Sequence, residues 1–256
     1  MKESYGDVIA RRDGHVALLE INRPPNNHVS VDLIRSLADA LDDVDKERDL
    51  RVSVLTSAGK HFCAGADFSQ STSGVGGGAN DLYAEAVRLF SAKKPIVAAI
   101  QGAAIGAGLG LALVADFRVA APEARFAANF VKLGFHPGFG ISFTLPRIIG
   151  PQKAALMCLT GRRIKGEEAL SWGLVDDLAP IGMLRETALA LARELAENAP
   201  LAVETTRATM RAGLAEQVKA QTDREFVIQS ALRKTADFAE GIRAVAERRP
   251  GKFTGA

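Results

Sequence analysis

Two segments of small residues, each preceded by a short apolar run, constrain this chain more than any other feature. Residues 61–68 follow the strand-like run Val52–Ser57, and residues 101–110 follow Ile96–Ile100. The glycines in these segments let the backbone approach a ligand closely. Neither segment offers an obvious nucleophile. The pattern therefore predicts a site of backbone N–H donors, which suits the stabilisation of an oxyanion.

Short apolar runs alternate with helical patterns over the first two thirds of the chain, and helical patterns dominate the last third. This order predicts an α/β core with a helical C-terminal region. Val8–Arg12 and His15–Ile21 are expected to form a hairpin that turns at Asp13-Gly14, and Ser30 is the expected N-cap of the next helix. Two further strands are expected over 117–120 and 125–127. Helices are expected over 81–92, 105–115, 140–149, 152–160, 166–172, 184–197, 201–211, 217–233 and 236–247.

Charge and hydropathy exclude several classes of protein. The formal net charge of +2 over 256 residues argues against a broad nucleic-acid surface. The longest apolar run, Ala103–Ala115, contains glycines and falls short of the ~20 residues of a membrane span. The first residues do not resemble a secretory signal, so a cytoplasmic location is expected. Cys63 and Cys158 have neither a metal-binding nor a disulfide spacing, and no metal site is expected.

The glycine segment at 106–108 is open to more than one interpretation. A dinucleotide-binding loop would require a third glycine at position 111, where Leu111 stands. An oxyanion hole fits better, because Ala107 falls in the first turn of the helix expected over Ile105–Ala115, where N–H groups lack intrahelical partners. Ala66 offers a second N–H from the other segment. The alternative is that both segments are only tight entries into helices.

A series of motifs along nearly the whole chain resembles the enoyl-CoA hydratase/isomerase family, also called the crotonase superfamily. The matching segments are 22–27 (N-R-P-P-N-N), 62–67, 102–116, 133–138, 145–150, 159–161 and 169–175. The resemblance implies a spiral of repeated ββα units over residues 1–195. It also implies a helical C-terminal region, residues 196–256, that joins subunits into homotrimers, often paired as hexamers.

The same resemblance implies an acyl-CoA thioester as ligand and no cofactor beyond the coenzyme A of the substrate. It assigns the oxyanion hole to the amides of Ala66 and Ala107. The coenzyme would contact Asn27, His28, Val29, Ala64, Gly65, Ala66, Asp67 and Phe68, with His28 at a position where the family usually has alanine. The acyl pocket would contain Gly106, Gly110, Phe130, Pro137 and Gly138.

The two glutamates that activate water in family hydratases align with Gly110 and Phe130. Positioned acid–base groups contribute about 10²–10⁴-fold each, so ordinary hydration is expected to be weak or absent. The expected activity is therefore that of a lyase or isomerase of fatty-acid metabolism that performs isomerisation, decarboxylation, hydrolysis or an atypical hydration. The alternative is a non-catalytic acyl-CoA-binding protein.

His136 is the leading candidate for proton transfer, because imidazole titrates near neutrality and its loop follows Phe130. Its alternative role is a backbone hydrogen bond that shapes the loop. Ser69–Asn80, rich in serine and glycine, is expected to be a mobile lid. The side chains that follow this lid and those on the coenzyme side are weaker candidates, each with an alternative role as a solvated surface residue. These are His61, Asp81, Tyr83, Glu85, Arg248, Arg249 and Lys252.

Overall fold

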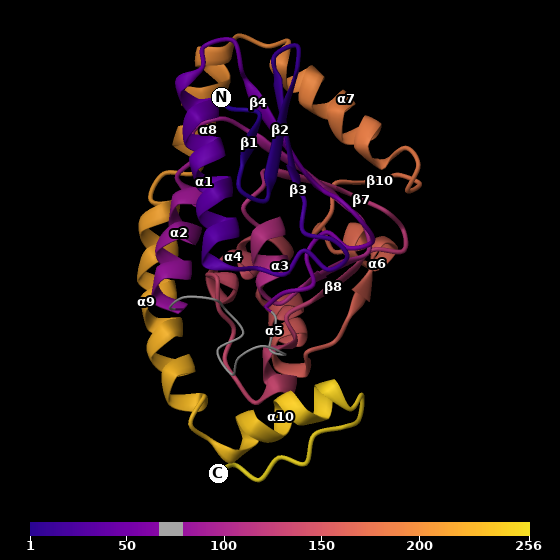
Figure 1. Ribbon diagram of the computed structural model, residues 1–256, viewed down its shortest axis with the longest axis vertical. Coiled ribbons are helices and arrows are strands. Elements are labelled where there is room, and N and C mark those ends of the chain that lie inside the picture. Colours follow the sequence, from indigo (N-terminus) through magenta and orange to yellow (C-terminus); the bar gives the residue numbers. More distant parts are fainter. Residues whose placement is uncertain (67–78) are drawn as a thin grey trace.

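A computed structural model describes residues 1–66 and 79–256 (Figure 1). A seven-stranded sheet has the order β1-β2-β3-β4-β5-β7-β10, and a three-stranded sheet has the order β6-β8-β9. The strands of the large sheet are β1 (Ser4–Tyr5), β2 (Val8–Asp13), β3 (Val16–Ile21), β4 (Val52–Ser57), β5 (Ile96–Ile100), β7 (Phe117–Ala120) and β10 (Asp177–Leu178). Those of the small sheet are β6 (Ala103–Ile105), β8 (Arg125–Ala127) and β9 (Ile164–Lys165).

Strands β5 to β8 form a repeat in which the first strand of each consecutive pair joins the large sheet and the second joins the small sheet. β5 and β7 pair in parallel in the large sheet, while β6 and β8, which follow them in the chain, pair in parallel in the small sheet. An earlier turn of the same kind begins with β4, after which Cys63 forms a parallel bridge to Ala104 of β6. The expected spiral of ββα units is therefore confirmed. The expected hairpin of β2 and β3 is also present, although it turns at Gly14-His15, because Asp13 still pairs with Val16.

Helices enclose this spiral. They are α1 (Val31–Lys46), α2 (Ala79–Phe90), α3 (Ala107–Ala112), the 3₁₀ helix η1 (Asn129–Leu133), α4 (Ile141–Ile149), α5 (Pro151–Thr160), α6 (Gly166–Ser171), α7 (Leu184–Ala196), α8 (Pro200–Met210), α9 (Leu214–Leu232) and α10 (Ala236–Ala246). Ser30 caps α1 as expected, since its hydroxyl accepts a hydrogen bond from Leu33 N. α9 packs along α2, and α10 packs against η1 at the lower end of the molecule (Figure 1).

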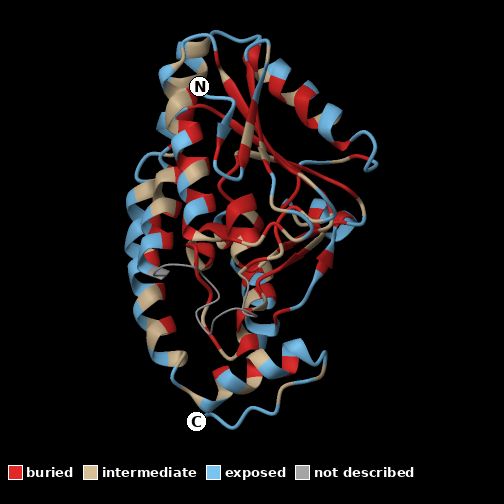
Figure 2. Ribbon diagram, in the orientation of Figure 1, coloured by how far each residue is buried: buried red, intermediate tan, exposed pale blue. Residues whose placement is uncertain are grey.

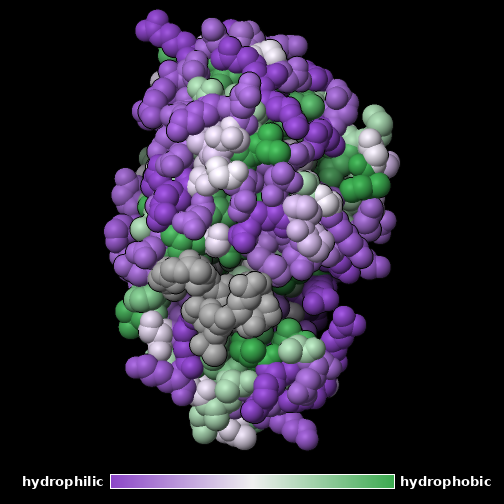
Figure 3. Space-filling model, viewed as in Figure 1, coloured by the Kyte–Doolittle hydropathy of each residue, from purple (hydrophilic) through white to green (hydrophobic). Residues whose placement is uncertain are grey.

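The central strands β4 and β5 are buried along their whole length (Figure 2), as is usual for parallel sheets covered by helices. Val54 and Val97 belong to the apolar cluster under α7, whereas their neighbours Leu55 and Ala98 belong to the cluster that also contains residues of α1 and α2. The outer face in Figure 3 is mainly hydrophilic, with separate hydrophobic patches. None of the helices in the described part of the chain combines the length and apolarity needed to cross a membrane.

The helix expected over Ile105–Ala115 is shorter than predicted. Ala103–Ile105 forms β6, and α3 covers only Ala107–Ala112. Gly106 lies between the two elements with φ 56°, a left-handed conformation that favours glycine. The sequence did not indicate this change from strand to helix, because the whole segment is apolar. Ala107 nevertheless lies in the first turn of the helix, as the sequence predicted, and is its first residue.

Candidate active site

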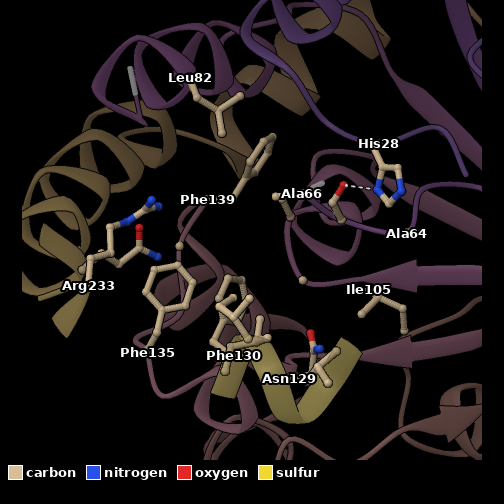
Figure 4. A pocket seen from close by; sticks show the side chains of 18 of the residues that line it. His28, Ala64, Ala66, Leu82, Ile105, Asn129, Phe130, Phe135, Phe139 and Arg233 are labelled. Carbon is tan, nitrogen blue, oxygen red and sulfur yellow. Dashed lines mark hydrogen bonds between the residues drawn. The ribbon is translucent and has the colours of Figure 1, made fainter. Parts of the chain in front are cut away.

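A cavity of about 340 Å³ lies where the spiral meets the C-terminal helices (Figure 4). Its walls come from the loop after β4, the junction of β6 and α3, η1 and the loop that follows it, and the helices α2, α9 and α10. Most of the lining side chains are apolar, and several are aromatic. Tyr83, Phe130, Phe135 and Phe139 form the aromatic part of the lining. Such a cavity is typical of a small-molecule site.

Backbone hydrogen bonds hold the two small-residue segments together. Cys63 N donates to Ala103 O over 2.9 Å, and Ile105 N donates to Cys63 O over 3.1 Å. Two glycines permit this approach. A methyl group on Gly108 would lie 2.1 Å from Cys63 O, and one on Gly65, whose φ is +91°, would lie 2.8 Å from Ile105 O. The packing of the two backbones therefore requires glycine at both positions.

The amides of Ala66 and Ala107 belong to residues that line the same cavity. Within the described part of the chain, neither N–H donates to a protein acceptor. Ala107 N lacks a partner because it is the first residue of α3. It also lies near the other segment, since a methyl group on Gly65 would be 4.0 Å from Ala107 N. The structure thus brings the two predicted donors to one cavity, and their role as an oxyanion hole stays a prediction.

The residues predicted to contact coenzyme A fall into three groups. Ala64, Gly65, Ala66 and His28 line the cavity, whereas Asn27 and Val29 are buried and are not among its described lining residues. The Asn27 side chain accepts a hydrogen bond from Arg23 N and donates to Ala58 O and His61 O, so it fixes the loop. Asp67 and Phe68, like most of the expected lid, lie outside the described residues.

The predicted acyl-pocket residues are also divided. Gly106, Phe130 and Gly138 line the cavity, whereas Gly110 and Pro137 are not among its described lining residues. Gly110 faces Phe139 instead, and a methyl group at position 110 would lie 2.7 Å from the Phe139 ring. An aromatic side chain therefore fills the space in front of Gly110, the position that the family resemblance matches to the first glutamate.

Tyr83 occupies the space beside Gly138. A methyl group on Gly138 would lie 2.1 Å from the Tyr83 hydroxyl oxygen. This hydroxyl donates to Gln229 Oε1 over 2.7 Å, and Gln229 Nε2 donates to His136 O over 2.8 Å. Burial raises the pKa of Tyr83 well above its usual range, so the phenol stays protonated. Of the three candidates that follow the expected lid, only Tyr83 is a described lining residue, since Asp81 is exposed and Glu85 pairs with arginines.

The candidate histidines His136 and His61 each contact the protein backbone. His136 is not among the described lining residues, and its Nδ1 lies 2.7 Å from Pro137 O. It therefore has the backbone contact of its alternative role, and its part in proton transfer stays a prediction. His61 accepts a hydrogen bond from Ala103 N over 3.3 Å, and partial burial lowers its pKa.

Asp116, Cys63 and the charged C-terminal candidates are not among the described lining residues of this cavity. Asp116 accepts hydrogen bonds from Ile96 N, Arg207 and Arg211, so its carboxylate has a structural role. Burial raises the pKa of the Cys63 thiol to about 12, so it is not a ready nucleophile. No group of three or more potential metal ligands occurs in residues 1–66 and 79–256. Arg249 pairs with Glu240 and Glu247, and the predicted contacts of Arg248, Arg249 and Lys252 with phosphates stay predictions.

Sequence reasoning did not single out several lining residues, among them Phe139, Gln229 and Arg233. Gln229 and Arg233 lie one helical turn apart on α9, far from the glycine segments in the chain. The Arg233 guanidinium lies 5.1 Å from the centre of the Phe135 ring, and burial lowers its pKa. The sequence feature that could have identified Gln229 and Arg233 is their spacing of four residues, which places both polar side chains on one helix face.

The paired strands and the cavity where they meet the C-terminal helices define a crotonase-fold protein. A family model for enoyl-CoA hydratase/isomerase matches residues 11–256, and the chain belongs to this family. It is 32% identical over 257 residues to the 1,2-epoxyphenylacetyl-CoA isomerase of Escherichia coli, covering 97% of this chain and 98% of the relative. It is 35% identical over 247 residues to the (E)-benzylidenesuccinyl-CoA hydratase of Thauera aromatica, covering 94% and 96%. The structure of EchA1_1 from Mycobacterium paratuberculosis superposes with a TM-score of 0.88 at 32% identity, covering 98% of this chain and 99% of that one.

Proposed function

We propose that this protein is an enzyme that binds an acyl-CoA and stabilises the enolate or oxyanion of its thioester through the N–H groups of Ala66 and Ala107. The observation that carries the proposal is that both amides, unpaired within the described chain, come from residues lining one apolar cavity. Family membership supports the choice of a CoA thioester as ligand. The enzyme needs no cofactor other than the coenzyme A of its substrate.

The amides themselves, rather than a helix dipole, supply the stabilisation in this proposal. α3 contains only six residues, so few peptide dipoles are aligned behind Ala107. A preorganised N–H donor in a site that excludes water still contributes roughly 3–4 kcal/mol to an oxyanionic transition state. Two such donors account for a large part of the barrier reduction of an enolate-forming reaction.

The reaction we propose is one that does not depend on the glutamate pair of family hydratases. No aspartate or glutamate occurs among the described residues of the cavity lining. Isomerisation, decarboxylation, hydrolysis or an atypical hydration fits this lining better than ordinary hydration. The proton that moves in such a reaction is then transferred by the Tyr83 hydroxyl, by the His136 imidazole after it leaves Pro137 O, or by ordered water. The aromatic part of the lining receives the acyl group.

The sharpest test is Ala107→Pro. Proline is tolerated at the first position of a helix, where it removes an N–H that has no intrahelical partner. We expect turnover to fall about 10²–10³-fold while the protein keeps its thermal stability. Ala107→Gly and Ala107→Val keep the N–H, the second with added bulk, and both should retain much more activity than the proline variant. Equal activity of the proline and valine variants would contradict the proposal.

A non-catalytic acyl-CoA-binding protein is the second candidate, favoured by the absence of carboxylates from the described lining. Incubation with a panel of acyl-, enoyl- and 3-oxoacyl-CoAs, followed by mass spectrometry, separates the two functions. Turnover of any member supports the enzyme, and its loss in Tyr83→Phe or His136→Ala identifies the proton carrier. Micromolar binding without any turnover would establish the binder.

We further propose that the chain assembles as a homotrimer or hexamer in the cytoplasm and takes part in fatty-acid metabolism. The support for assembly is the exposure of large apolar side chains on the C-terminal helices. Leu201 and Met210 of α8 and Val227 of α9 are 75%, 76% and 68% exposed. Light scattering coupled to size-exclusion chromatography should give three or six times the mass of 27.1 kDa; a monomer would contradict this part.

A further inference from the structure

The Gly65 carbonyl accepts two hydrogen bonds from neighbouring residues. Val29 N donates over 2.9 Å, and His28 Nδ1 lies 3.1 Å away (Figure 4). A carbonyl oxygen can only accept, so the histidine contact requires a proton on Nδ1. The half-buried His28 ring, which also lines the cavity, is thereby fixed in one orientation.

The same peptide group carries the Ala66 N–H. The cis peptide bond in residues 1–66 is Pro24-Pro25, so the Gly65–Ala66 peptide is trans, and its C=O and N–H point in opposite directions. The hydrogen bonds that hold the Gly65 oxygen toward His28 and Val29 therefore point the Ala66 N–H away from these two residues. Ala66 itself lines the cavity. The orientation of this donor thus depends on what the Gly65 oxygen binds.

The second donor has a matching arrangement. Ala107 N shares its peptide group with Gly106 O, and this oxygen accepts hydrogen bonds from Leu109 N over 2.9 Å and from Gly110 N over 3.1 Å. Both candidate donors therefore belong to peptides whose carbonyl accepts two bonds. For Ala107 the start of α3 supplies both bonds. For Ala66 one bond comes from the backbone of Val29, and the other comes from a side chain.

We propose that His28 is a positioning residue that orients and polarises the Ala66 N–H through the Gly65 carbonyl. The inference rests on the proposed function, because it concerns one of the two oxyanion donors. A hydrogen bond to a carbonyl strengthens the N–H of the same peptide as a donor, by about 10–30% in condensed-phase estimates. Because His28 acts on the far side of the peptide, it improves stabilisation of the oxyanion without touching the reacting atoms.

Two substitutions separate this role from simple packing. In His28→Asn the side-chain amide can occupy the place of Nδ1 and donate to Gly65 O, whereas His28→Leu removes the donor and keeps an apolar bulk. His28→Gln also carries an amide, but one bond longer, so it reaches the place of Nε2. His15→Asn is the matched control, because the His15 ring contacts a backbone carbonyl, Asp49 O, over 2.7 Å at an exposed turn.

The readout is the absorption maximum of bound dimethylaminocinnamoyl-CoA, which moves to longer wavelength when the thioester carbonyl is polarised. We expect the full red shift in the wild type, His15→Asn and His28→Asn, and a clearly smaller shift in His28→Leu and His28→Gln. Turnover of a substrate found in the acyl-CoA panel should fall about two- to tenfold in the leucine variant and recover in the asparagine variant.

The outcomes distinguish this inference from the function on which it rests. A wild type that binds the thioester without any red shift would overturn the oxyanion hole itself. A normal wild-type shift that persists in His28→Leu would overturn only the role of His28. If the leucine variant does not fold, the comparison of His28→Asn with His28→Gln decides, and equal shifts in these two would refute the inference.

Discussion

Glycine at position 108 sets the distance between α3 and the loop of Cys63. Replacing it with alanine would gain up to about 1 kcal/mol of helix propensity. The added methyl group would, however, lie 2.1 Å from Cys63 O, a backbone atom that already accepts a hydrogen bond from Ile105 N. The clash outweighs the propensity, because a backbone carbonyl cannot move aside as a flexible side chain can.

We therefore expect Gly108→Ala to lower the free energy of unfolding by about 1–3 kcal/mol and to reduce acyl-CoA binding, since the two donor loops separate. Urea unfolding and a binding titration check these two effects. Gly182→Ala is the control, because nothing lies within 4 Å of its added methyl group. It should change stability by less than about 0.5 kcal/mol. Equal stability of the two variants would show that the loops do not need their close contact.

At the candidate site, the sequence predicted backbone positions better than side-chain directions. That Ala66 and Ala107 lie at one site could be predicted, because glycine spacing indicates where a backbone turns. The filling of the space at Gly110 by Phe139 could not, because Phe139 reaches it through a left-handed φ of 61°. Tyr83 and Gln229 meet although 146 residues separate them in the chain. Such contacts depend on how α2 and α9 pack, which local patterns do not encode.

At the scale of elements, the longer helices and the buried strands were predicted closely, and several of the shortest elements were missed. The 117–120 and 125–127 strands have the expected bounds. β6 was missed because its three residues continue an apolar run into α3. β9 and β10 contain two residues each, too few for a periodicity to show. The expected boundary at residue 195 falls at the end of α7, and the roles assigned to the two regions stay predictions.

α10 forms one wall of the cavity through Ile242, Val245 and Ala246, and its first turn depends on one hydroxyl. Thr235 Oγ1 accepts a hydrogen bond from Phe238 N over 3.1 Å. Loss of such a cap costs about 1 kcal/mol. We expect Thr235→Ala to raise hydrogen exchange of the α10 amides about fivefold and to weaken acyl-CoA binding by a similar factor at most.

Ser30→Ala is the matched control for this prediction. Ser30 caps α1 in the same way as Thr235 caps α10, but it is not a described lining residue of the cavity. It should raise exchange in the first turn of α1 and leave α10 protected. If both variants weaken binding equally, the effect comes from general destabilisation rather than from the cavity wall.

At the scale of the whole molecule, a buried carboxylate joins the C-terminal helices to the core. Glu225 of α9 is 0% exposed and accepts hydrogen bonds from Gly140 N over 2.8 Å, from Ser142 N over 3.3 Å and from the Ser142 hydroxyl. These donors lie at the start of α4, so the Glu225 side chain links α9 to α4. The bonds offset only part of the cost of burying the charge, and burial raises the pKa of Glu225 to about 7.

This raised pKa predicts how the stability of the fold depends on pH. The unfolded chain binds the Glu225 proton with a pKa near its ordinary value of 4.5, while the folded chain binds it near 7. The folded state therefore holds more protons between these values, and the contribution to stability is complete below pH 4.5 and is lost as pH rises through 7. Between these two pKa values the contribution of Glu225 to the free energy of unfolding should fall with rising pH by up to about 1.4 kcal/mol per pH unit.

Urea unfolding at several pH values from 5 to 8 measures this slope, and Glu225→Gln should flatten it. Asp223→Asn, an exposed carboxylate on the same helix, should leave the slope unchanged; an unaltered slope in Glu225→Gln would place its origin elsewhere.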